Sequence, residues 1–369
     1  MKAKSIKGKS PEEIKIALQQ SVADGFKPTL AVAFLSIEQN IEAICAILDK
    51  QEISIFGATS SSEFIEGEIS EGSVAILLLD IKKAGFKILI ENFGGRNQEE
   101  VAKAMGLSAL ESFKNPLFLI CNSFVIAEMF SGESIISGLE STVGSHLTLW
   151  GGNAGDDKKF DHSVVFTNHQ SFQTGFLMLV INGDNLSITG RAAFGWKPAG
   201  TIRTITRSDK NSIYTIDDHP ALDIVFKFLG LKLTKEEPEK FIPGSATLCL
   251  VRENGAPVMR NINMYNWEDK SVSVVGKNEP GTTFRFAVPP DFEIVETVIN
   301  DPQQIKDTGF TDADALVIFS CISRLDELGP MVRVEIDRLK NIFNAQMADF
   351  FTYGEFHNTT CCRVASKER

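Results

Sequence analysis

The stretch TLAVAFLSIEQNIEAICAILDKQEISIFGATSSSEF (residues 29–64) predicts a strand, a helix and a second strand in immediate succession. The continuous apolar run 29–36 indicates a buried strand, and apolar residues at helical spacing over 40–50 indicate a helix. The second strand, 53–56, ends at Gly57 and is followed by hydroxyl side chains. A loop of this kind can line a pocket for a polar ligand, and it can equally be a turn that satisfies its own backbone.

Two later segments repeat this order. The second has a strand at 116–126, a helix at 131–144 and a strand at 147–150 before GGNAGDD, and the third has equivalents at 314–324, 331–343 and 348–356. Shorter strands are expected between them, at 185–193 and from 246 to 288. The sequence therefore predicts an α+β fold: largely antiparallel β-sheets covered by helices on their outer faces, layered αββα-like and built from repeated strand–helix–strand units.

Composition limits the classes of partner. The net charge of −11 and the scattered basic residues argue against nucleic acid. No apolar run has the length needed to span a bilayer, and the basic start, MKAKSIKGKS, lacks the apolar region of a secretory signal. We therefore expect a cytoplasmic protein without a membrane partner. The cysteines show no metal-ligand spacing, and no metal site is expected.

Several motifs, taken in order, resemble those of the FIST family of sensory proteins. They are FGATSSSEF, EISEGSVAILLLD (68–80), WGGNAGDD (150–157), FGWKPAG (194–200), SCISR (320–324) and FTYGEF (351–356). The resemblance covers about residues 30 to 366 and implies a FIST N-like domain over 29–218 and a FIST C-like domain over 219–369, after a basic tail or helix over 1–28. It further implies a cytoplasmic ligand-sensing module, with amino acids as the ligand class and a signalling partner such as a histidine kinase or a diguanylate cyclase.

The candidate ligand-binding residues come from the three regions where the second strands end, except Arg324, which lies at the end of the neighbouring strand 314–324. Arg324 suits the carboxylate of a zwitterionic ligand and Glu355 suits its ammonium group. Two glycine-rich loops would supply close backbone approach and polar contacts. The full set is Gly57, Thr59, Ser60, Ser61, Gly151, Gly152, Asn153, Asp156, Arg324, Tyr353, Gly354 and Glu355.

Two other functions remain open at this stage. Some relatives in the family are haem-binding nitric oxide sensors, and haem needs an axial ligand, for which His146 and His219 are the candidates. A hydrolase using a Ser or Thr of residues 57–62 would need a positioned base, and neither a P-loop nor a GxSxG elbow is present there. A non-catalytic sensor without a cofactor is the expectation that we carry forward.

Overall fold

The computed structural model describes residues 1–65, 68–124, 132–190, 192, 195–232, 246–251, 257–288, 313–329 and 331–357. The chain forms two compact units. The first, here called the sandwich unit, comprises Met1–Met129, Ser134–Ala193 and Phe292–Arg369. The second, here called the barrel unit, comprises Phe194–Asp291 and Phe130–Glu133.

The sandwich unit contains two large sheets, with strand orders β1-β6-β2-β3-β10-β11 and β24-β9-β8-β12-β7, and two smaller sheets, β21-β23-β4-β5 and β20-β22. Its strands are β1 (Ala3–Gly8), β2 (Leu30–Ser36), β3 (Ser54–Ser60), β4 (Glu63–Ile65), β5 (Glu68–Ser70), β6 (Val74–Leu79), β7 (Phe86–Asn92), β8 (Pro116–Asn122), β9 (Thr148–Asn153), β10 (Val165–Phe166), β11 (Ser171–Phe172), β12 (Gly175–Asn182), β20 (Ala315–Leu316), β21 (Phe319–Cys321), β22 (Gln346–Met347), β23 (Asp349–Thr352) and β24 (Glu355–His357). Its helices are α1 (Pro11–Val22), α2 (Ile41–Asp49), α3 (Gln98–Ser112), α4 (Gly132–Val143), α7 (Ile322–Leu328) and α8 (Met331–Phe343).

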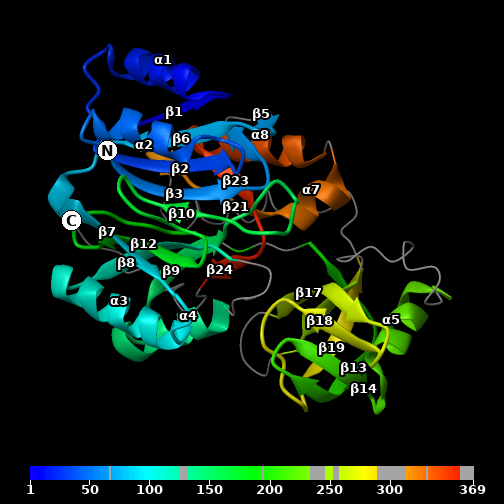
Figure 1. Cartoon of the computed structure of the whole chain (residues 1–369). Coiled ribbons are helices and arrows are strands. Elements are labelled where there is room, and N and C mark those ends of the chain that lie inside the picture. The colour runs from blue at the N-terminus through cyan, green and yellow to red at the C-terminus, as the bar shows by residue number, and fades with distance from the viewer. Residues whose placement is uncertain are drawn as a thin grey trace. The chain divides into compact units, whose positions relative to one another are not determined.

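The two large sheets stack face to face and helices cover their outer faces (Figure 1). Phe34 and Leu77 of one sheet share a buried core with Leu119 and Leu179 of the other. Helices α1 and α2 bury their apolar sides against the outer face of the first sheet, while α3 and α4 lie on the side of β8 and β9 (Figure 1). The predicted α+β fold with αββα layers is therefore confirmed.

Besides the parallel pair β20–β22, three parallel strand pairs lie within the described part of these otherwise largely antiparallel sheets. They are β2–β3, β8–β9 and β21–β23, and each pair is joined through helices. The last residue pair of each ladder, at the carboxyl end, contains at least one hydroxyl or amide side chain: Ser36–Ser60, Asn122–Asn153 and Cys321–Thr352. The repeated units inferred from sequence are thus real, and each places polar side chains where parallel strands end. Ligands of α/β sheets commonly bind at such ends.

The strands begin and end differently from the prediction in several places. Strand β3 continues through Gly57 to Ser60, so this glycine is not a turn residue; a Cβ there would lie 2.2 Å from the ring of Phe166. Gly151 and Gly152 likewise lie inside β9. The expected basic tail contains strand β1, which pairs with β6, whereas the described part of 185–193 contains no strand.

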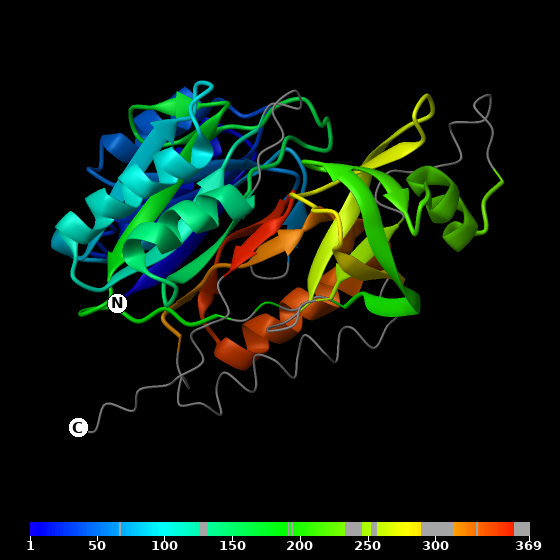
Figure 2. The same ribbon diagram turned by 90° about the horizontal axis from the view of Figure 1, so that it is seen from below.

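The barrel unit is a closed antiparallel barrel that the sequence did not predict as such. Its ladder β13-β19-β16-β17-β18-β14 closes because β13 also pairs with β14, and Ile205, Leu248 and Phe284 belong to its own core. The elements are β13 (Lys197–Asp209), β14 (Ser212–Ile216), β15 (His219–Pro220), α5 (Ala221–Leu229), β16 (Thr247–Leu250), β17 (Val258–Asn266), β18 (Ser271–Val274) and β19 (Thr283–Val288). Figure 2 shows the strands of this unit from below. Within the described residues of both units, no helix combines the length and apolarity needed to cross a membrane.

Candidate functional site

Backbone hydrogen bonds bring the first and third predicted loops together. The Ser61 amide donates to the Phe351 carbonyl at 3.1 Å, and the Phe351 amide donates to the Ser62 carbonyl at 3.0 Å. Strand β4 continues this contact, because Glu63 is paired in register with Phe350. The end of the first strand–helix–strand repeat is thereby joined to the second strand of the third repeat.

Thr59 joins the first loop to the second. Its hydroxyl donates to the Gly155 carbonyl at 2.6 Å and accepts from the Val164 amide at 2.9 Å. The Gly155 amide in turn donates to the Thr59 carbonyl at 2.9 Å. A Cβ on Gly155 would lie 2.3 Å from the Ser61 hydroxyl, so this glycine is required for the close approach.

The second and third loops meet at the end of β9. The Asn153 side-chain amide donates to the Tyr353 carbonyl at 3.0 Å, and the Asn153 backbone amide donates to the Gly354 carbonyl at 2.8 Å. Gly152 is paired with Glu355 across the β9–β24 ladder. The structure therefore brings all three predicted loops into one place.

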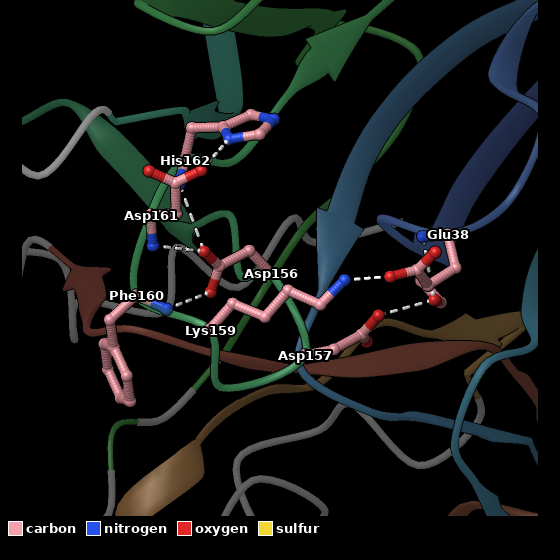
Figure 3. Close-up of polar contacts among 8 residues, drawn as sticks. Glu38, Asp156, Asp157, Lys159, Phe160, Asp161 and His162 are labelled. Atoms are coloured by element: carbon pink, nitrogen blue, oxygen red, sulfur yellow. Dashed lines mark hydrogen bonds and ion pairs between the residues drawn. The ribbon is translucent and has the colours of Figure 1, made fainter.

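Asp156 holds the loop that follows β9. Its carboxylate accepts hydrogen bonds from the backbone amides of Phe160, Asp161 and His162, at 3.0, 2.7 and 3.1 Å (Figure 3). It also accepts a hydrogen bond from the Tyr353 hydroxyl at 2.6 Å. These four donors match the acceptor capacity of a carboxylate. Asp156 is therefore an internal clamp within the site.

Neighbouring residues of this loop contact the other two strand–helix–strand repeats. The Ser36 hydroxyl at the end of β2 donates to Asp157 at 2.6 Å, and Lys159 forms an ion pair with Glu38 (Figure 3). Lys158 forms another ion pair, at 2.6 Å, with Asp326 on α7. The loop 156–162 thus connects strand ends from all three repeats.

The predicted site residues separate into buried and accessible groups. Thr59, Ser60, Ser61 and Asp156 are at most 3% exposed, so their side chains support the loops from inside. Asn153, Tyr353 and Gly354 are partly exposed, and Glu355 is exposed. A ligand that approaches the described residues from solvent meets this second group.

Arg324 is buried on α7 and forms an ion pair with buried Glu335 of α8. Its second terminal nitrogen, Nη1, has no hydrogen-bond partner among the described residues. The ion pair therefore uses Nη2 alone, and Nη1 is buried beside it. The positive charge of Arg324 also acts on Glu355 and favours the ionised form of that carboxyl.

Desolvation by the surrounding atoms is the largest effect on this carboxyl and raises the pKa of Glu355 to about 7. The hydrogen bond from Thr352 and the charge of Arg324 act in the opposite direction and offset only part of this rise. The side chain of Glu355 is nevertheless accessible, so solvent moderates the cost of its ionisation. A carboxyl in this position can exchange a proton with solvent and, when ionised, can accept hydrogen bonds from an ammonium group.

Sequence reasoning missed two residues at the same strand ends. Glu63 lies in the opening FGATSSSEF stretch, is 1% exposed, and is held by the Ser60 hydroxyl and by the amide and hydroxyl of Ser73. Asn122 is also 1% exposed, and neither atom of its amide has a partner among the described residues. No sequence signal pointed to them, because Glu63 comes well after the predicted strand 53–56 and Asn122 lies inside the predicted strand 116–126.

The alternative functions receive no support from the residues that they need. Ser60 is fully buried and its hydroxyl donates to Glu63, which leaves it closed to a substrate. His146 and His219 are both exposed, whereas an axial haem ligand belongs in an apolar pocket. Among the described residues, no group of three or more His, Cys, Asp or Glu is arranged to hold a metal ion.

An open hollow of about 330 Å³ in the sandwich unit lies apart from the predicted residues. It is lined by the turn before α2 and by the β10–β11 region, including Gln39, Ile41, Val164 and Phe172. None of the predicted ligand-binding residues lines it. The hydrogen bonds described above, rather than this hollow, define the candidate site.

Comparison with known families agrees with this architecture. The model of the FIST N domain matches residues 29–219 and the model of the FIST C domain matches residues 221–358. No curated protein matches the chain. FIST domains are sensory domains of signal-transduction proteins. The chain, with its repeated strand–helix–strand units and matching motifs over most of its length, therefore belongs to the FIST family.

Proposed function

We propose that this protein is a non-catalytic cytoplasmic sensor that binds a small zwitterionic metabolite, such as an amino acid, at the carboxyl ends of the parallel strand pairs β2–β3, β8–β9 and β21–β23. The observation that carries the proposal is the unpartnered Nη1 of buried Arg324, which lies within electrostatic range of accessible Glu355. A buried guanidinium nitrogen without a partner is costly, and a ligand carboxylate would satisfy it.

The two groups suit opposite ends of one ligand. Arg324 donates to a carboxylate, and ionised Glu355 accepts from an ammonium group. The accessible Asn153, Tyr353 and Gly354 lie beside Glu355 and provide further polar contacts. Because the loops come from three separate strand–helix–strand repeats, a ligand that contacts them would favour one arrangement of those repeats. Such a difference in affinity between conformations is what a sensor needs.

A signalling partner would read this change, and a histidine kinase or a diguanylate cyclase is the class that we propose. The family assignment supports a role in signal transduction.

The test is a thermal-shift screen of the twenty amino acids against the wild-type protein and an Arg324→Met/Glu335→Met variant. Changing both partners avoids leaving a buried unpaired carboxylate. At about 100 times its Kd, a bound amino acid stabilises the fold by roughly 2.7 kcal/mol. We expect this stabilisation in the wild type and its loss in the double variant.

Arg203→Met is the matched control, because it also removes an ion-paired arginine, here from the barrel unit. It should retain the full ligand response. If no amino acid raises the Tm of the wild type, or if the Arg324 variant responds as strongly as the wild type, the proposed function is wrong.

A further inference from the structure

Phe160 occupies an unusual conformation in the loop 156–162. Its φ of 52° lies in the left-handed region, which bulky side chains rarely adopt. Asp157 and Lys158 of the same loop also have positive φ, at 55° and 62°. The three backbone amides bound by the Asp156 carboxylate, including that of Phe160 itself, maintain this conformation.

The conformation keeps an aromatic ring in solvent. Phe160 is 51% exposed, and its side chain projects away from the polar contacts of the loop (Figure 3). One face of the ring stacks on Tyr353, with centroids 4.7 Å apart and planes 11° apart. Tyr353 is itself in contact with Phe124, at 5.5 Å between centroids. A strained residue that exposes an apolar ring serves folding poorly, and such strain is commonly retained for function.

Tyr353 is fixed beneath this ring. Its hydroxyl donates to Asp156 at 2.6 Å, and burial, followed by that hydrogen bond, raises the pKa of the phenol. The Ser61 hydroxyl, which is buried and has no partner of ordinary geometry, faces the same phenol and acts on its pKa in the opposite direction. The stacked pair is therefore a rigid platform directly beside Gly354 and Glu355.

We propose that the Phe160–Tyr353 pair is a stacking platform that selects ligands with a planar aromatic ring, so that the sensed metabolite is an aromatic amino acid. The inference rests on the proposed function, because the charged ends of the ligand are assigned to Arg324 and Glu355. Lys158 supports the arrangement, since its ion pair with Asp326 ties the loop to the helix that carries Arg324. A ring lying on the exposed face of Phe160 would gain offset or edge-to-face contact.

The experiment compares phenylalanine, tyrosine and tryptophan with leucine and isoleucine, by thermal shift and by calorimetric affinity. In the wild type, at least one aromatic amino acid should bind more tightly than both aliphatic ones. Phe160→Gly should weaken its binding by about tenfold, and Phe160→Tyr should restore it. Because glycine adopts positive φ freely, Phe160→Gly should not lower the Tm of the unliganded protein.

Glu52→Gly is the matched control for the backbone effect. Glu52 also has a positive φ, 55°, in the same unit, and its side chain is not aromatic. This variant should bind as the wild type does. If an aliphatic amino acid binds best, or if Phe160→Gly leaves affinity unchanged, the stacking platform is wrong while the sensor function stands. If no amino acid binds the wild type, both proposals fall.

Discussion

Glu63 is a buried carboxyl with no cationic partner among the residues that the structure describes. Its three hydrogen bonds come from Ser60 and Ser73, and desolvation, only partly offset by these bonds, raises its pKa to about 7. The nearby charge of Asp157 acts in the same direction as desolvation. Glu63 therefore keeps its proton in the folded protein up to a higher pH than an ordinary glutamate does.

The raised pKa predicts how stability depends on pH. The protonated form contributes stability that is complete below the unfolded pKa of 4.5 and is lost as the pH rises through about 7. The loss amounts to about 3 kcal/mol. We expect Glu63→Gln to remove this dependence and to be more stable than the wild type at pH 8, as measured by urea unfolding from pH 4 to 9. Glu355→Gln should remove less, because solvent reaches that side chain. Parallel pH profiles for wild type and Glu63→Gln would show that Glu63 does not titrate in this range.

Some properties of single residues could be predicted from the sequence and others could not. Arg324 and Glu355 have residue types that match a zwitterion, and they were chosen as candidates for that reason. Glu63 was present in the first stretch considered, but its burial depends on pairing with Phe350, which is far away in the chain. The left-handed φ of Phe160 is imposed by Asp156 and follows no local pattern.

At the scale of elements, the loop 156–162 depends on one carboxylate. Replacing Asp156 by Asn turns one acceptor oxygen into a donor that faces amide hydrogens and the Tyr353 hydroxyl. A hydrogen bond to a charged group is worth roughly 1.5–3 kcal/mol, so Asp156→Asn should cost at least that amount of stability. The amides of Phe160, Asp161 and His162 should then exchange faster with deuterium. Asp157→Asn, which affects one hydrogen bond from Ser36, should leave those amides protected. Equal exchange in the two variants would show that Asp156 does not hold the loop.

Periodicity predicted the elements better than their ends. Apolar spacing placed the helices and strands of the first two repeats close to where they lie, whereas the end of the predicted strand 314–324 in the third repeat forms helix α7. It stopped β3 and β9 at their first glycines, because glycine usually breaks strands. Here Gly57 and Gly152 are inside strands to admit the Phe166 ring and the Thr352 methyl, contacts between segments distant in sequence. The barrel was missed for a similar reason, since closure depends on the pairing of β13 with β14 and β19.

At the scale of the whole molecule, the family division and the compact units follow different boundaries. The FIST N and FIST C matches meet between residues 219 and 221, beside the division expected at 218, which lies within the barrel unit. All the predicted ligand-binding residues belong to the sandwich unit. The barrel unit has a groove of its own, of about 540 Å³, lined by residues including Tyr214, Met264 and Trp267. The location of the ligand would therefore show whether the sandwich unit or the barrel unit contains the binding site.

The most direct measurement is a crystal structure of the full chain grown with the amino acid that gives the largest thermal shift. We expect electron density for one ligand in the sandwich unit, with its carboxylate on Nη1 of Arg324 and its ammonium group on Glu355. Its side chain should lie against Phe160. Density in the barrel groove beside Trp267, with Arg324 Nη1 still without a partner, would contradict the central claim that the three strand ends form the sensory site.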